Sequence, residues 1–210
     1  MKLLTVGDSF TWGEELEDRN LAWPYRLGEK LGYEVTNLAK PGSGNSRMIR
    51  TVVQQADQYD LVIVAWSHFA RTELADAHGA YDLWPGSRAD IYPDHMSHRQ
   101  EVIEYYNRYH NDQYLYTQYL LGIILLQNFF KSMGVRYLMI DSFGNNQHRH
   151  LDVPLTAKIS AEFYPGWSNE TMMEWTYGSA QGPGGHFLAE GHQQVAEKLY
   201  EHIRHLSWIS

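Results

Sequence analysis

The six apolar residues Leu61-Val62-Ile63-Val64-Ala65-Trp66 constrain the fold of this chain more than any other stretch. An unbroken apolar run of this length is typical of a strand covered on both faces, and such strands belong to parallel sheets buried between helices. Three shorter segments, at residues 3–6, 34–38 and 135–140, predict further strands. The chain is therefore expected to contain a buried sheet of at least four strands.

Helical patterns separate these predicted strands. Apolar residues recur at helical spacing between Leu21 and Leu31, and Gly32 is well placed to end that helix. A second amphipathic helix is expected to open near Ser46, and residues 195–203 carry one apolar face of a last helix. Alternating strands and helices predict an α/β domain with a mainly parallel sheet and right-handed crossovers.

The crossover after the third strand is longer than such connections usually need. We interpret residues 74–118 as an insertion within a single domain that spans residues 1–210, because no repeat or low-complexity linker interrupts the chain. The first part of the insertion is polar and contains Trp84 and Tyr92, which would suit a lid or a subunit contact. Its second part is helical and rich in tyrosine; a buried helix face is the first explanation and an aromatic wall for a sugar or acyl chain is the second. These tyrosines are Tyr105, Tyr106, Tyr109, Tyr114, Tyr116 and Tyr119.

Composition excludes several classes of function. The net charge is -8 with no block of basic residues, so nucleic acid is not expected as a partner. The absence of cysteine excludes disulfides and thiolate metal sites. The apolar stretch at 119–130 is shorter than the roughly 20 residues of a membrane-spanning helix, and the one at 3–6 is too short for a signal peptide. A soluble protein, cytoplasmic by default, is expected; its oligomeric state stays open.

Residues that could carry chemistry follow the predicted strands. In an open parallel sheet, ligands bind beyond the carboxyl ends of the strands. Gly7-Asp8-Ser9 follows the first strand, residues 41–45 the second and Ser67-His68 the third, and Gly184-Gly185-His186 precedes the last helix. Together these segments supply a hydroxyl, flexible backbone amides and imidazoles, which are the groups that acyl transfer requires.

In this order and spacing, the chain resembles the SGNH hydrolases of the GDSL esterase/lipase superfamily over most of its length. The resemblance implies a three-layer, flavodoxin-like fold and a reaction without a cofactor. It also implies that Ser9 is the nucleophile, that His186 is the general base, and that the amides of Ser9 and Gly42 form an oxyanion hole. Gly44 is the alternative to Gly42 because either glycine would supply flexible backbone.

The third motif departs from the pattern of this superfamily. The superfamily usually has Gly-x-Asn-Asp here, with Asn as an oxyanion donor, whereas this chain reads Trp66-Ser67-His68-Phe69. His68 takes the position of the Asn, where a neutral imidazole N–H would serve as the donor. A packed core histidine is the alternative for His68. Ser67 is a weaker candidate for the donor and a candidate for contact with substrate.

The last motif departs as well. The superfamily usually has Asp three residues before the histidine, and this chain has Pro183. Either a backbone carbonyl near Pro183 accepts the N–H of His186, which gives a Ser-His dyad, or a carboxylate arrives from elsewhere. Asp141 is the candidate carboxylate because it ends the fourth strand and strand ends face the site.

Simpler structural roles compete with these functional ones. Ser9 would also suit a turn, with Asp8 bracing it, because Gly-Asp-Ser is common turn chemistry. Asn45 is expected to be the N-cap of the second helix, with substrate contact as the minor interpretation.

Several charged and imidazole side chains are not expected to take part in chemistry. His148 and His150 lack a third ligand at a telling spacing, so no metal is expected. Arg71 and Glu73 are expected to form an ion pair at the rim of the site, with a clamp on the substrate as the alternative. His192 is expected to help build the turn into the last helix.

The predicted function is hydrolysis of an O-acyl ester by a serine mechanism. A short acyl chain on a carbohydrate is favoured over a lipid because the aromatic residues lie in a polar insertion. Two alternatives stay open. One is an O-acyltransferase that uses the same residues, and the other is a non-catalytic carbohydrate-binding module on an esterase scaffold.

Overall fold

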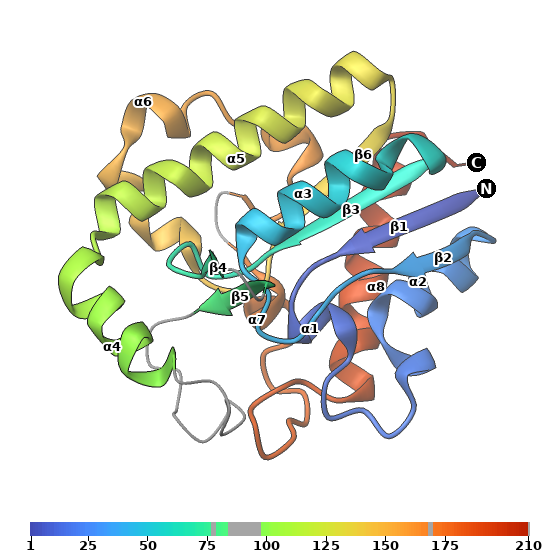
Figure 1. The fold of residues 1–210 in the computed structure, drawn as a ribbon. Helices are drawn as coiled ribbons and strands as arrows, with labels where there is room; N and C mark the ends of the chain where they lie inside the picture. Colours follow the sequence, from blue (N-terminus) through green and yellow to red (C-terminus); the bar gives the residue numbers. More distant parts are fainter. Residues whose placement is uncertain (77–78, 84–97, 168–169, 210) are drawn as a thin grey trace.

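The computed structural model describes the chain apart from residues 77–78, 84–97, 168–169 and 210. Its centre is a four-stranded parallel sheet in the order β2-β1-β3-β6 (Figure 1). The strands are β1 (Lys2–Val6), β2 (Glu34–Asn37), β3 (Leu61–Trp66) and β6 (Arg136–Asp141). The predicted α/β class and parallel sheet are confirmed, and this strand order is that of flavodoxin-like folds.

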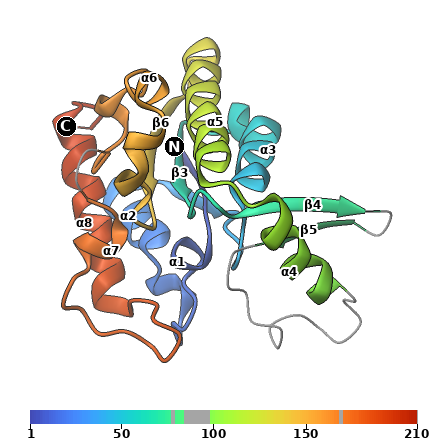
Figure 2. The same cartoon turned by 90° about the vertical axis from the view of Figure 1, so that its left-hand side faces the viewer.

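Helices cover both faces of the sheet, as Figure 2 shows from the side. Because successive side chains of a strand point to opposite faces, Val62 and Val64 of β3 pack into one core cluster and Ile63 into another. The first cluster is covered by α3 (Asn45–Gln55) and α5 (Asp112–Met133), and the second by α2 (Trp23–Leu31) and α8 (Ala189–His205). Three layers result, with every residue of β3 buried between them.

The first large helix begins later than its apolar spacing predicts. A short 3-10 helix, Arg19–Leu21, precedes α2, which opens at Trp23 with proline at its second position. The backbone N–H of Trp23 donates to Nδ1 of His192 at 3.2 Å, so this imidazole caps α2 from the opposite end of the sequence. Gly32 ends the helix in the left-handed conformation, as predicted.

The predicted insertion contains an antiparallel strand pair that its sequence pattern did not indicate. Strands β4 (Thr72–Asp76) and β5 (Gly79–Leu83) form this second sheet, and α4 (His98–Tyr109) follows. The last residues of the predicted insertion, 112–118, are the first two turns of α5. Trp84 and Tyr92 lie outside the described residues.

The tyrosine series divides between core and surface. Tyr116 and Tyr119 lie on the buried face of α5, whereas Tyr109 and Tyr114 are 66% and 60% exposed. A buried helix face therefore explains only part of the series.

Short helices connect the larger elements. They are α1 (Ser9–Trp12), η2 (Ala56–Gln58), η4 (Asn145–Leu151), α6 (Val153–Thr156), η5 (Ala161–Phe163) and α7 (Met172–Trp175). Figure 1 shows α1 and the β4–β5 pair at the carboxyl edge of the parallel sheet, and in Figure 2 α1 lies between α7 and the β4–β5 pair. In the part of the chain that the structure describes, none of the helices combines the length and apolarity that crossing a bilayer requires.

Candidate active site

Ser9 is the first residue of α1, directly beyond the carboxyl end of β1. Asp8 caps this helix, because its buried carboxylate accepts the N–H of Phe10 at 3.1 Å and the hydroxyl of Ser142 at 3.2 Å. A Cβ at Gly7 would lie 2.3 Å from Oγ1 of Thr11, so only glycine fits before the cap. Asp8 therefore braces the turn, as predicted, and Ser9 is held at the sheet edge.

The electrostatic surroundings of Asp8 are unusual for a capping residue. Burial raises the pKa of its carboxyl, and the nearby Arg71 guanidinium, 3.9 Å away, opposes that rise. Arg71 also lies over the ring of Phe143 at 4.9 Å. The predicted pairing of Arg71 with Glu73 is wrong, because Glu73 forms a two-pronged pair with Arg50 and Arg71 turns toward Asp8 instead.

Gly42 lies in a tight turn next to Ser9. The N–H of Ser43 donates to the carbonyl of Lys40 at 3.1 Å, and Gly42 has φ of 73°, which a type II turn with proline before glycine requires. Lys40 in turn donates its N–H to the carbonyl of Gly7 at 3.1 Å. The turn is thereby fixed against the segment that leads into Ser9.

The backbone N–H groups of Ser9 and Gly42 have no hydrogen-bond acceptor among the described residues. Two unpaired amides at one sheet edge are suited to bind a developing negative charge. Gly44 is not equivalent, because its N–H donates to the carboxylate of Asp82 at 2.8 Å.

The second sheet secures the turn that carries Gly42. Asp82 of β5 is buried and accepts both the N–H of Gly44 and the ammonium of Lys40, each at 2.8 Å. A Cβ at Gly44 would lie 2.9 Å from the carbonyl oxygen of Thr72, so β4 packs directly against the turn. The inserted strands thus hold the Gly42 loop through Lys40 and Gly44, which flank the turn.

His68 follows β3 and is half-buried. Its Nδ1 accepts the N–H of Ala70 at 3.2 Å, which places the proton of the neutral ring on Nε2. Burial lowers the pKa of His68 to about 4, with a smaller contribution from His148. The side chain is therefore neutral at ordinary pH and has one N–H to donate, which the predicted oxyanion role requires.

Asn45 and Ser67 support the loop after β3. The side chain of Asn45 accepts the N–H of Ser67 at 3.0 Å and donates to the carbonyls of Ser67 and His68. Gly44, not Asn45, is the N-cap of α3. Both Asn45 and Ser67 are buried, so the substrate contacts proposed for them are replaced by structural roles.

The imidazole of His186 is held by Glu15. Its Nδ1 lies 2.9 Å from Oε2 of Glu15, and the same carboxylate accepts the N–H of Gly184 at 2.7 Å and that of His186 at 3.1 Å. The hydrogen bond from Gly184, followed by those from His186, lowers the pKa of Glu15. A carboxylate can only accept, so Nδ1 carries the proton and the lone pair of His186 is on Nε2.

Two backbone features show that Glu15 is built into the site. Glu15 has φ of 66°, a left-handed conformation that residues other than glycine rarely adopt and that clusters at functional sites. Across from it, a Cβ at Gly182 would lie 2.6 Å from Cδ of Glu15, and one at Gly184 would lie 3.0 Å from Oε2. The Gly-Pro-Gly-Gly segment that contains Pro183 therefore wraps around the carboxylate of Glu15.

The prediction that Asp141 orients His186 is wrong. One oxygen of the buried Asp141 carboxylate accepts the hydroxyl of Tyr119 at 2.6 Å and the amide of Asn145 at 2.8 Å. Burial raises its pKa to about 6. The alternative of a backbone carbonyl near Pro183 is wrong as well, because Glu15 occupies Nδ1 of His186.

Contacts between aromatic rings place His186 next to α1. The ring of His186 lies 4.8 Å from that of Phe10, the residue after Ser9. Among the described residues, no hydrogen bond joins Ser9 to His186. Nε2 of His186 lies 3.9 Å from a carboxylate oxygen of Glu14.

The remaining histidines have structural surroundings. His192 is buried, and burial lowers its pKa to about 3, which suits its role as an uncharged cap of α2. His148 and His150 stack at 6.4 Å between ring centroids. The described residues include no group of three or more His, Asp or Glu side chains placed to hold a metal ion.

A family model matches residues 12–210 of this chain. The chain belongs to DUF6071, a family of unknown function. The match includes Glu15, Gly42, His68 and His186 but begins after Ser9. Among curated proteins, none matches.

Solved structures of esterases share the fold. EstA, a psychrotrophic esterase from Pseudoalteromonas sp., is 11% identical with a TM-score of 0.58, and the match covers 99% of both chains. A Desulfitobacterium hafniense DCB-2 protein placed in the G-D-S-L lipolytic family is 13% identical with a TM-score of 0.52, over 96% of this chain and 98% of that one. The acetyl xylan esterase Est2A from Butyrivibrio proteoclasticus is 13% identical with a TM-score of 0.56, over 99% of this chain and 65% of that one. At these identities the likeness establishes the shared fold.

Proposed function

We propose that this protein is a serine esterase in which Ser9 is the nucleophile, His186 the general base and Glu15 the residue that positions His186. The contact of 2.9 Å between Nδ1 of His186 and Glu15 carries the proposal. It holds the imidazole in the tautomer whose Nε2 can accept a proton, next to the helix that Ser9 begins.

The chemistry proceeds in two halves. Oγ of Ser9 bonds to the ester carbonyl carbon while its proton passes to Nε2 of His186, and the carbonyl π electrons move to oxygen. The backbone N–H groups of Ser9 and Gly42, with Nε2–H of His68, donate to that oxyanion. When the C–O bond breaks, His186 returns the proton to the departing alcohol. Water then adds to the acyl-enzyme by the same route and releases the carboxylic acid and Ser9.

The alcohol portion of the substrate is proposed to be a carbohydrate and the acyl group to be short. A structural neighbour, Est2A, is an acetyl xylan esterase, and another is a two-domain esterase active on acetylated mannans. Two carboxylates, Glu14 and Glu15, lie next to His186. These charged groups favour a hydrated alcohol over a lipid chain.

Hydrolysis of p-nitrophenyl acetate by the wild type and by Ser9→Ala tests the nucleophile. Ser9→Ala should lower kcat/KM by about a thousandfold or more, because the whole covalent route depends on this oxygen. Ser132→Ala, an exposed serine on α5, is the matched control and should keep full activity. A fluorophosphonate should label wild-type Ser9 and leave Ser9→Ala unlabelled.

The outcomes separate this proposal from its alternatives. Equal hydrolysis by the wild type and Ser9→Ala would remove Ser9 as nucleophile. A folded wild type that neither hydrolyses esters nor takes the label would favour a non-catalytic binding module. Adding a sugar acceptor distinguishes a transferase, because acylated sugar would then form in place of free acetate.

A further inference from the structure

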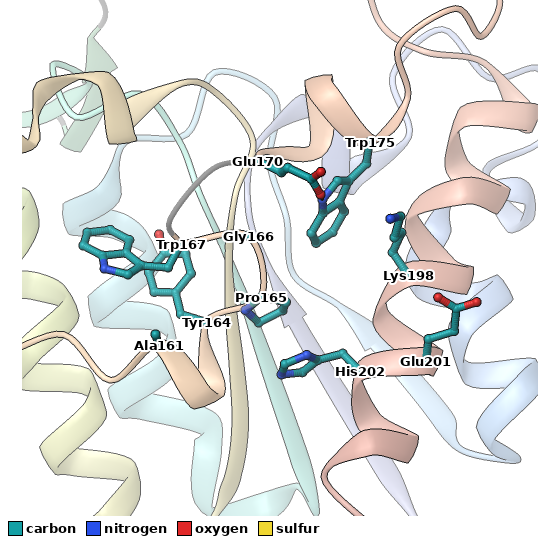
Figure 3. Close-up of a pocket in the computed structure, with 10 residues that line it drawn as sticks. All are labelled: Ala161, Tyr164, Pro165, Gly166, Trp167, Glu170, Trp175, Lys198, Glu201 and His202. Carbon is teal, nitrogen blue, oxygen red and sulfur yellow. The ribbon is translucent and has the colours of Figure 1, made fainter.

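A pocket of about 420 Å³ lies between α8 and the segment 161–175 (Figure 3), and Ser9 is not among the residues that line it. Its volume is within the range of about 300–1,000 Å³ typical of small-molecule sites. One wall comes from the segment after η5 and from α7, and the other comes from α8. Its lining combines aromatic, acidic and basic side chains: Tyr164, Trp167, Glu170, Trp175, Lys198, Glu201 and His202.

Trp175 provides a fixed aromatic surface in this pocket. Its indole N–H donates to Oε2 of Glu170 at 2.8 Å, which sets the plane of the ring. Gly166 has φ of 79°, and a Cβ there would lie 3.2 Å from the indole and 2.3 Å from the carbonyl oxygen of Glu170. The backbone beneath Trp175 therefore needs a glycine, and the ring stays partly exposed toward the pocket.

Both hydrogen-bond donors and acceptors surround this ring. Figure 3 shows Lys198 beside Trp175 and His202 below it, both reaching from α8 toward the pocket. Nε2 of His202 lies 2.8 Å from the carbonyl oxygen of Glu162, to which it donates, so the neutral ring leaves Nδ1 as an acceptor. The ammonium of Lys198 donates, and the second oxygen of Glu170 accepts.

We propose that this pocket binds a neutral saccharide unit. A sugar ring has an apolar C–H face that suits an indole and a rim of hydroxyls that both donate and accept. The charges that line the pocket have both signs, which disfavours a ligand of high net charge. The choice of carbohydrate rests on the proposed function, but binding here does not require chemistry at Ser9.

The pocket is separate from the catalytic residues. Lys198 is nine residues into α8, roughly 14 Å along the helix from Ala189, which follows closely after His186. One monosaccharide cannot reach both places. The pocket would therefore hold an unreacted part of a longer carbohydrate while an esterified unit lies at Ser9.

Titration with unsubstituted xylotetraose and mannotetraose, followed by calorimetry and by saturation-transfer NMR, tests this site. The wild type should bind at least one of them with a Kd in the millimolar range, as should Ser9→Ala. Trp175→Ala should weaken binding at least about tenfold, and Trp175→Phe should weaken it less because an aromatic face remains. Lys198→Ala should weaken binding, whereas Arg204→Ala, an exposed cation on α8 outside the pocket, should not.

Hydrolysis of p-nitrophenyl acetate by the Trp175 and Lys198 variants should equal that of the wild type, because this small ester does not reach the pocket. Absence of binding to the wild type, or equal binding by the wild type and Trp175→Ala, would overturn the proposal. If Trp175→Ala does not fold, the comparison of Lys198→Ala with Arg204→Ala decides. Failure of the esterase proposal would appear separately, as equal ester hydrolysis by the wild type and Ser9→Ala.

Discussion

The two corners of the candidate site are built in different ways. The Ser9–Gly42 corner consists of backbone turns at the ends of neighbouring strands, joined by the N–H of Lys40 to the carbonyl of Gly7. The His186 corner depends on the side chain of Glu15, which is 171 residues away in sequence. Turns of the first kind have local sequence signatures, whereas a side chain that arrives from a distant segment has none.

The same contrast explains the missing aspartate at Pro183. In this chain the Gly-Pro-Gly-Gly segment has no acidic side chain of its own, and it closes around the carboxylate of Glu15, which lies just beyond α1. The proposed nucleophile and the proposed positioning residue therefore come from one short stretch, residues 9–15. The proposed triad is in this respect divided into two pieces of chain instead of three.

Apart from loss of Ser9 itself, the largest expected effect is that of Glu15→Gln. The side-chain amide of Gln is uncharged, so it is a weaker acceptor for Nδ1–H of His186. The imidazole would then be held less firmly in the orientation and in the tautomer that leave Nε2 free to accept a proton. We expect kcat to fall by about 10²–10⁴-fold, the scale seen when an orienting carboxylate is neutralised. Ester hydrolysis across a pH series is the measurement.

Glu14→Gln is the matched control for that variant. Glu14 is the neighbouring carboxylate and lies 3.9 Å from Nε2 of His186 without a hydrogen bond. Its neutralisation should change kcat by less than about tenfold. If Glu14→Gln had the larger effect, the assignment of Glu15 as the positioning residue would be reversed.

A smaller effect is expected from loosening the other corner. Asp82→Asn keeps an oxygen for the N–H of Gly44 but removes the charge that pairs with Lys40. The Gly42 turn should become less fixed, and kcat should fall by about three- to tenfold with little change in KM. Glu73 lies on the neighbouring strand β4, and Glu73→Gln, which breaks its pair with Arg50 of α3, should leave kcat unchanged. Equal losses in the two variants would point to a general loss of stability instead.

Asp141→Asn should have no effect on kcat, because Asp141 lies outside the His186 corner.

Burial raises the pKa of Asp141 from its ordinary value of 3.8 to about 6 in the folded protein. The native state therefore binds the proton more tightly than the unfolded chain does, and stability is lost as pH rises from about 4 through about 6. That difference in pKa corresponds to about 3 kcal/mol. Asp141→Asn removes this loss, so the variant should gain stability relative to the wild type between about pH 4 and pH 7.

Chemical denaturation at several pH values measures that difference. The wild type and Asp141→Asn should diverge only above about pH 4. A parallel pH dependence in the two proteins would contradict the raised pKa, and a strong loss of kcat in Asp141→Asn would restore Asp141 to the catalytic residues.

Local patterns predicted the fold well. The apolar run Leu61–Trp66, the termination of α2 at Gly32 and the parallel sheet follow from periodicity and turn chemistry, which act over a few residues. The β4–β5 pair was missed because its segment is polar. The only local sign of a role for Glu15 is its place in the acidic pair Glu14-Glu15, directly after Gly13.

The sequence by itself determined the parallel α/β architecture and the candidate positions Ser9, Gly42 and His186, because strand ends and glycine turns carry their own signatures. Only the tertiary structure decided that Glu15 and not Asp141 faces His186. Only the tertiary structure likewise showed that Asn45 and Ser67 support the loop after β3 and that Asp82 secures the Gly42 turn. Each of these depends on a hydrogen bond between segments far apart in the chain, and such pairings are selected by packing geometry that no local pattern records.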